Sequence, residues 1–211
     1  MKESSESQQV FSDEHPLWQN FQQGDDAALA SIYSRYFDHL YNYGFKFTHD
    51  ALLVEDCIQE LFIKLMRNRR NLATPVSVKN YLFKAFRFQL FDELEKLKKR
   101  SADELQKSTA FDLELQHHTD TQSEDVSERH QKLQAAIEQL TPRQREVIFL
   151  KYQEGFSYPE IAEILSLTPK ATYKLVGRAI QTLRSNIFLN SWGKITGIAV
   201  FMLNNPFLAY P

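Results

Sequence analysis

Apolar residues recur at steps of three and four along two separate stretches of this chain, and that spacing constrains its fold more than any other feature. One face of an α-helix repeats at this interval, whereas strands would show strict alternation and tight Asn-Gly or Asp-Gly turns, which are missing here. Hydrophobic residues make up 43% of the 211 residues, enough to form a packed core. The sequence therefore predicts an all-α protein.

Charge is distributed in three blocks, although the formal net charge is only −2. Residues 101–139 hold nine acidic and three basic side chains, with few large apolar residues. Basic residues prevail before this block, at 79–100, and after it, at 169–186, where no acid occurs. This pattern predicts two small helical domains joined by a flexible acidic linker. The expected boundaries are a disordered N-terminus at 1–16, a first domain at 17–100, the linker at 101–131, a second domain at 132–187 and an apolar tail of unassigned role at 188–211.

The helix predicted over residues 53–67 has an apolar stripe and, on another side, a compact polar face. Asp56, Gln59 and Glu60 share that face because they are three and four residues apart. Such a face is either solvated or a docking surface for a basic partner helix, and the residues alone favour solvation. Cys57, the chain's only cysteine, falls on the apolar stripe, which indicates a small core residue rather than a disulfide or a reactive thiol.

The helix predicted over residues 78–98 combines bases and large aromatic rings on one side. Cations attract phosphates and flat rings stack on unpaired bases, so this face is suited to single-stranded nucleic acid. Packing of Phe88 and Phe91 against a helix at residues 29–43 is an equally good interpretation. The predicted face consists of Lys84, Arg87, Phe88, Phe91, Glu95 and Lys98, and the predicted core stripe of Leu82, Ala85, Phe86, Leu90, Leu94 and Leu97.

Three helix starts are predicted in the second domain, because Thr141, Ser157 and Thr168 each have the pattern of an N-cap with a nearby proline. Gly155 is expected to end the first of these helices. A short helix at 158–165, a three-residue turn and a basic helix from residue 169 make a helix-turn-helix. The third helix would enter the DNA major groove by its N-terminal half. Its candidate base or phosphate contacts are Lys170, Thr172, Tyr173 and Lys174, with Arg178 on the DNA backbone.

Two other classes of function have less support in the sequence. A stand-alone helix-turn-helix regulator would account for the second domain but not for the polar face at Asp56. An enzyme is disfavoured, because the chain has neither a Gly-rich phosphate loop nor a His-x-x-x-His pair. His117 and His118 are adjacent but lack further ligands, so we expect no metal, no cofactor and no small-molecule substrate.

Two regions of the chain resemble one family. Residues 54–66, VEDCIQELFIKLM, are similar to the region 2 helix of bacterial RNA polymerase sigma factors of the extracytoplasmic-function (ECF) group. Residues 140–152, LTPRQREVIFLKY, and 155–165, GFSYPEIAEIL, resemble region 4 of the same proteins. The resemblance covers roughly residues 17–187, with both motifs in the family's order around an acidic linker.

The resemblance implies a role for each surface. Asp56, Gln59 and Glu60 would dock on the clamp helices of the polymerase largest subunit. The helix from Tyr81 to Arg100 would open and read the −10 promoter element, adding Tyr81 to the candidates; the family usually has Trp there, and Asn at Phe88. The helix from Pro169 would read the −35 element, and the acidic linker would thread toward the polymerase RNA channel. The implied partners are core RNA polymerase, promoter DNA and an anti-sigma factor, which would hold a cytoplasmic protein at the inner membrane.

Overall fold

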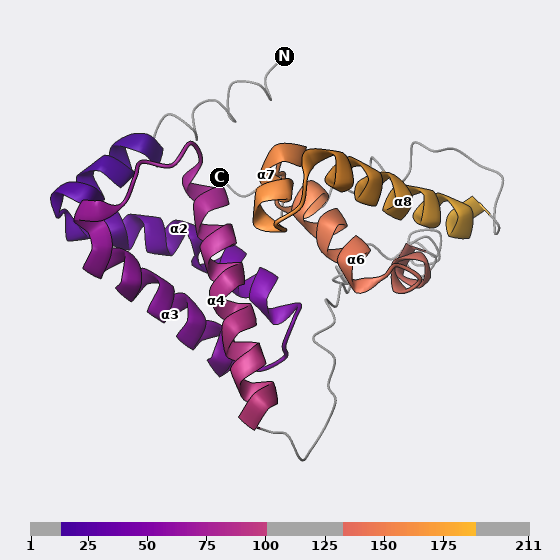
Figure 1. The fold of residues 1–211 in the computed structure, drawn as a ribbon, viewed down its shortest axis with the longest axis horizontal. Helices are drawn as coiled ribbons and strands as arrows, with labels where there is room; N and C mark the ends of the chain where they lie inside the picture. The colour runs from indigo at the N-terminus through magenta and orange to yellow at the C-terminus, as the bar shows by residue number, and fades with distance from the viewer. Residues whose placement is uncertain (1–13, 101–132, 189–211) are drawn as a thin grey trace, which may run out of the picture. The chain divides into compact units, whose positions relative to one another are not determined.

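The computed structural model describes residues 14–100 and 133–188, and the chain divides into two compact units between residues 109 and 110. Every regular element in the described ranges is helical, which confirms the all-α prediction (Figure 1). The predicted acidic linker at 101–131 lies outside the described residues, and so do residues 1–13 and 189–211. No helix in the described part of the chain is long and apolar enough to cross a membrane.

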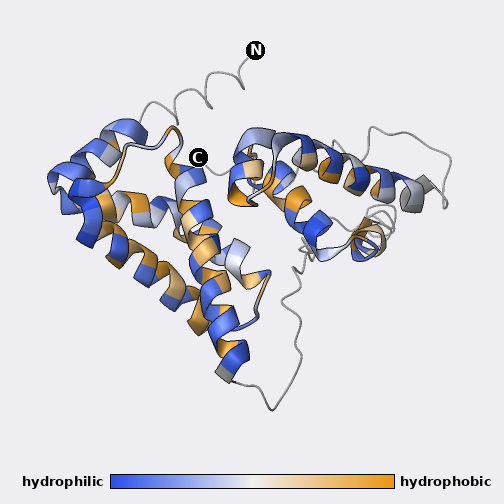
Figure 2. Ribbon diagram, in the orientation of Figure 1, coloured by the Kyte–Doolittle hydropathy of each residue, from blue (hydrophilic) through white to orange (hydrophobic). Residues whose placement is uncertain are grey.

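The first unit begins with a short helix at residues 14–23. Three longer helices follow it in the chain and pack on one another. Asp25 and Asp50 cap two of them: the Asp25 carboxylate accepts hydrogen bonds from two backbone N–H groups of the first turn of α2, and the Asp50 carboxylate accepts one from Leu53 in α3. Figure 2 shows apolar and polar residues alternating along α3 and α4, as in amphipathic helices. The elements are α2 (Asp26–Phe45), α3 (Ala51–Asn68), a 3₁₀ turn (Arg69–Asn71) and α4 (Val78–Arg100).

Aromatic side chains fill the centre of the first unit. The ring of Tyr43 lies 5.2 Å from that of Phe47 and 5.3 Å from that of Phe83, measured between centroids. Phe86 is fully buried beside it and contacts α2 at Gly44, where an added Cβ would lie 2.8 Å from the Phe86 ring. Glycine is therefore needed at position 44 so that α4 can approach α2 this closely.

The N-terminal helix is joined to α2 by a buried hydrogen bond. The hydroxyl of Tyr36 donates to the carboxylate of Glu14, and both residues are buried. Burial, followed by this contact with Glu14, raises the pKa of Tyr36. The predicted boundary of the disordered N-terminus at residue 16 is therefore too late. Residues 14–16 are helical, and Glu14 is buried in the unit.

The second unit is built from short helices with well-defined starts. Thr141 and Ser157 begin helices as predicted, and each forms a capping box, with Gln144 and Glu160 respectively. The hydroxyl of Thr168 accepts a hydrogen bond from the backbone N–H three residues on, at 3.2 Å. The elements are helical residues 133–138, α6 (Pro142–Ile148), a π-helical turn (Phe149–Gln153), α7 (Tyr158–Ile164) and α8 (Pro169–Phe188).

The helix-turn-helix prediction is confirmed by α7, the turn after it and α8. Ile161, Val176 and Ala179 are buried, and α7 packs against α8. Arg143 fixes α6 to the end of α7: one guanidinium nitrogen lies 3.0 Å from the buried Glu146 carboxylate, and another donates to the Leu165 carbonyl at 2.7 Å. The predicted stop at Gly155 is also correct, since its φ is +74°, but the π-helical turn before it was not predicted.

Candidate nucleic-acid interfaces

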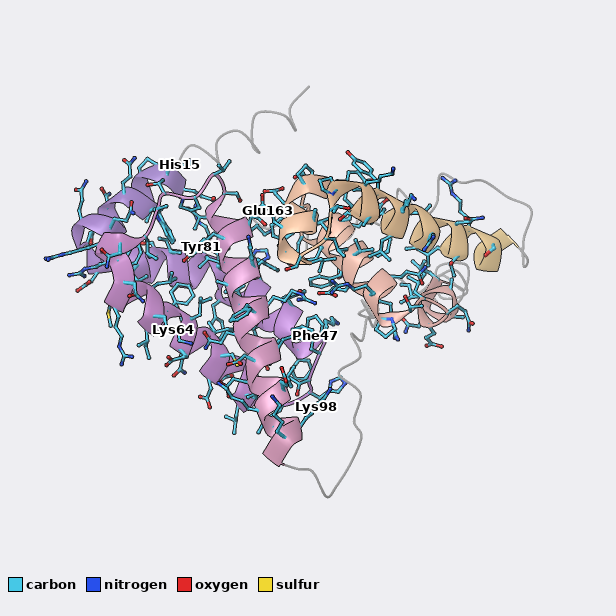
Figure 3. The ribbon with its side chains drawn as sticks, in the orientation of Figure 1. His15, Phe47, Lys64, Tyr81, Lys98 and Glu163 are labelled. Carbon is cyan, nitrogen blue, oxygen red and sulfur yellow. The ribbon has the colours of Figure 1, made fainter. Side chains whose placement is uncertain are left out.

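The polar face of α3 is accessible. Asp56 and Gln59 are exposed, and Glu60 is partly exposed with a carboxylate oxygen 3.7 Å from the Lys64 ammonium (Figure 3 labels Lys64). The Lys64 ammonium also donates to the side-chain oxygen of Gln89 on α4, at 3.2 Å. This face thus carries the three predicted docking residues and is linked through Lys64 to α4.

Gln89 is a site-supporting residue that sequence reasoning missed. Its side chain is buried, and its amide nitrogen donates to the Cys57 carbonyl at 3.0 Å. A buried amide among aromatic and aliphatic residues gives no signal in a single sequence. Cys57 is buried as predicted, and burial raises the pKa of its thiol to about 11, so at neutral pH it stays protonated.

The face of α4 divides into exposed and packed residues. Phe88 is 78% exposed and Lys84 is exposed, so both can contact a ligand. Phe91 packs edge-on against Phe47 at 5.0 Å between ring centroids, with the Arg87 guanidinium 4.3 Å from the Phe91 ring centre. The packing interpretation is therefore correct for Phe91, although its partner lies in the α2–α3 connection rather than at residues 29–43. Phe88 alone keeps a free aromatic ring on this face.

The two ends of α4 differ from each other in how far their side chains are exposed to solvent. Tyr81 is half-buried, with its ring 5.4 Å from that of Trp18, and burial raises the pKa of its hydroxyl (Figure 3). Lys98 is exposed, since α4 leaves the core after Leu90 and residues 95–99 are all exposed. The prediction that Leu97 belongs to the core is wrong for the same reason: it is 42% exposed.

The basic helix α8 presents four of its five candidate residues to solvent: Lys170, Tyr173, Lys174 and Arg178. The prediction that Thr172 contacts DNA is wrong, because its side chain is fully buried and its hydroxyl donates to the Thr168 carbonyl at 3.2 Å. Thr172 precedes the core residue Val176 by one helical turn, so it lies on the packed side.

Two tyrosines stack between α7 and α8, a contact that the sequence did not reveal. The ring centroids of Tyr158 and Tyr173 are 4.2 Å apart, and the planes are inclined by 26°. The Lys151 ammonium lies 4.9 Å from the centre of the Tyr158 ring and donates to the Phe156 carbonyl at 3.1 Å. In the described residues no three His, Cys, Asp or Glu side chains form a metal site, and His117 and His118 lie outside them.

Comparison with known protein families identifies the family of this chain. Residues 32–100 match Sigma-70 region 2, and residues 130–183 match Sigma-70, region 4. The two matches together cover more than half of the chain. The chain belongs to the sigma-70 family. The first match contains α3 and α4, and the second contains the helix-turn-helix, so each candidate surface of this sigma factor falls inside a family region.

Two curated relatives are sigma factors, and one of them is an ECF sigma factor by name. The ECF RNA polymerase sigma factor SigX of Bacillus subtilis is 25% identical over 163 residues, which cover 75% of this chain and 82% of the relative. The RNA polymerase sigma factor YlaC of the same organism is 23% identical over 165 residues, 76% of this chain and 92% of the relative. This chain is thus an ECF sigma factor matched along most of its length.

Solved structures show the same fold. CnrH, in complex with the cytosolic domain of CnrY, has a TM-score of 0.56 at 19% identity and covers 84% of this chain and 99% of its own. The sigma factor RpoE of Bartonella quintana, in complex with the anti-sigma factor NepR, has a TM-score of 0.55 at 18% identity, covering 77% and 98%. At these identities the likeness concerns the fold alone.

Proposed function

We propose that this sigma factor binds core RNA polymerase through α3 and directs initiation by reading promoter DNA with α4 and α8. The observation that carries the proposal is the presence of both family regions in one chain, each with an accessible surface of the right chemistry. Asp56 and Gln59 give α3 an exposed polar face. We take Glu60 as part of the same docking surface for the clamp helices of the largest subunit.

The −10 surface that we propose has fewer freely accessible residues than the sequence indicated. Phe88 is its free ring, and a ring that stacks on an unpaired base contributes roughly 1–3 kcal/mol. Lys84 and Lys98 would contact phosphates. Tyr81 and the Arg87–Phe91 pair are partly engaged within the unit and would shape the edge of the surface.

The −35 surface that we propose consists of exposed residues on α8. Lys170, Lys174 and Arg178 supply positive charge on a helix that has no acidic residue in its first turn. Phosphate contacts by such side chains release counterions, which makes binding strongly dependent on salt.

The protein would act as a non-catalytic subunit in the cytoplasm, where core polymerase is found. An anti-sigma factor is proposed as a further partner, because solved relatives of the same fold were captured with such regulators or with a cytosolic domain of another protein. Attachment to the inner membrane through that partner belongs to the same proposal.

Run-off transcription with core polymerase tests the proposal. Wild-type chain should support initiation from a promoter selected out of a random library, and Asp56→Ala/Gln59→Ala should abolish it by loss of core binding. The matched control is Asp38→Ala, an exposed acid on α2, which should leave transcription unchanged. A chain that binds duplex operators alone but never supports initiation would be the stand-alone regulator instead.

A further inference from the structure

The stacked tyrosines of the second unit are not used by the function proposed so far. Tyr173 lies at the fifth position of α8, in the N-terminal half, which is the part of a recognition helix that enters the groove. It is 56% exposed even though its ring is stacked on Tyr158. The side chain thus contacts α7 on one side and remains available on the other.

The candidates for reading a base on this part of α8 are few. Thr172 is buried and bonded to the backbone, and the methyl group of Ala171 has little reach. Lys170 and Lys174 are exposed cations on long flexible stems, which can contact phosphates as well as guanine edges. Tyr173 is therefore the one exposed residue of this stretch, 170–174, whose position is set by another side chain.

That position is fixed through a chain of contacts. Lys151 is anchored to the Phe156 carbonyl at 3.1 Å, and its ammonium lies 4.9 Å from the centre of the Tyr158 ring. Tyr158 itself follows the capping box at Ser157, so its backbone is also held. A side chain that is ordered before binding loses less conformational entropy when it contacts DNA.

The surface of α8 is open one turn beyond Tyr173. Gly177 lies one turn further along the same face, and a Cβ placed there would meet nothing within 4 Å. Glycine inside a helix costs about 1 kcal/mol relative to alanine, and no neighbouring atom of the protein requires it. No side chain at position 177 therefore covers the face of α8 that carries Tyr173.

We propose that Tyr158 is a positioning residue for −35 recognition, and that by stacking on Tyr173 it fixes that side chain as a base contact of α8. The ring edge and hydroxyl of Tyr173 would contact one base pair in the major groove, while Lys170 and Lys174 hold the flanking phosphates. This inference rests on the proposed function, since it assumes that α8 reads a promoter element.

Selection of −35 sequences tests the inference with the full chain and core polymerase. A promoter library randomised over the −35 region is transcribed, and the enriched sequences are compared between variants. Tyr173→Ala should lose preference at one position, by about 5- to 150-fold in discrimination. Tyr158→Ala should lose preference at that same position by about 2- to 12-fold, as expected for loss of an aromatic pair.

Further variants separate positioning from folding. Tyr158→Phe keeps the stack and should keep the preference, whereas Tyr158→Leu keeps an apolar side chain without a ring and should lose it. The double variant Tyr158→Ala/Tyr173→Ala should match Tyr173→Ala, because both changes remove one contact. Lys174→Ala is the contrasting control: it should weaken all sequences uniformly and lower the salt slope by about one.

Each result supports or overturns the inference. An unchanged preference in Tyr158→Leu, or equal weakening at every sequence in Tyr158→Ala and Tyr173→Ala, would show a purely structural stack or a phosphate contact and overturn it. If the wild-type chain with core polymerase enriches no −35 sequence at all, the proposed function itself has failed. The wild-type selection therefore tells the two failures apart.

Discussion

Both units of this sigma factor are packed helices, but different kinds of side chain fill their cores. The first has an aromatic core, including Trp18, Tyr43 and Phe86, whereas the second is mostly aliphatic, with Ile161 and Val176 among its buried residues. In the first unit a sequence therefore cannot tell a core ring from a ligand-binding ring. In the second, large rings are rare in the core, and an exposed one such as Tyr173 stands out.

Core truncation in the first unit should give the largest effect on stability. Phe86→Ala removes a fully buried ring that contacts Gly44, and we expect a loss of about 3–5 kcal/mol in the free energy of unfolding. Phe88→Ala, two residues away and 78% exposed, should change stability by less than about 0.5 kcal/mol. Chemical denaturation followed by circular dichroism measures both. Similar losses would mean that Phe88 packs into the core and is no free ring.

Glycine substitutions should have opposite signs in the two units. Gly44→Ala places a Cβ 2.8 Å from the Phe86 ring and 2.9 Å from Val54, so it should destabilise by about 1–3 kcal/mol. Gly177→Ala meets nothing and should stabilise α8 by about 0.5–1 kcal/mol. Thermal unfolding of the two variants compares them. A destabilised Gly177→Ala would contradict the open surface that we describe beside Tyr173.

Capping should matter most in the second unit, where helices are short. Ser157→Ala removes the side chain that pairs with Glu160 in the capping box of α7, and should cost about 1 kcal/mol. Ser34→Ala, an exposed change inside α2, serves as the control and should be neutral or slightly stabilising, since alanine favours helix. Urea midpoints report both, and equal effects would argue that the cap is not holding α7.

The titration of Cys57 is expected to leave stability unchanged at neutral pH and to act only in alkaline solution. Its pKa in the fold is about 11, whereas an unfolded cysteine titrates near about 8.5. The folded chain keeps the proton in that window and the unfolded chain loses it, so the stabilising contribution is complete below about pH 8.5 and lost as the pH rises toward 11. Slow reaction with a thiol reagent at neutral pH would accompany this. Rapid labelling of the native chain would show an accessible thiolate instead.

Periodicity and caps predicted much of the fold from sequence. The apolar stripe of α3, the starts at Thr141 and Ser157 and the stop at Gly155 follow from local rules, because each depends on residues within one or two turns. The assignments that failed depend on tertiary contacts. Phe91 was ambiguous until Phe47 was placed beside it, and Leu97 was assigned to a core that α4 has already left.

The candidate sites show the same division. Exposure of Asp56, Lys174 and Arg178 follows from helical phase alone. The burial of Thr172 could have been anticipated, because it lies one turn before Val176 on the packed side. The stack of Tyr158 on Tyr173 joins residues of two helices across a turn, and no local rule in the sequence specifies it.

The π-helical turn at Phe149–Gln153 makes this unit sensitive to chain length. A π-helical turn holds more residues than an α-helical one, so a deletion inside it changes which side chains share a face with those of α6. A deletion of Phe149 or Leu150 would shift Lys151 away from the Tyr158 ring, even with every remaining side chain unchanged. At this place the position of Lys151 depends on the number of residues before it as well as on their identity.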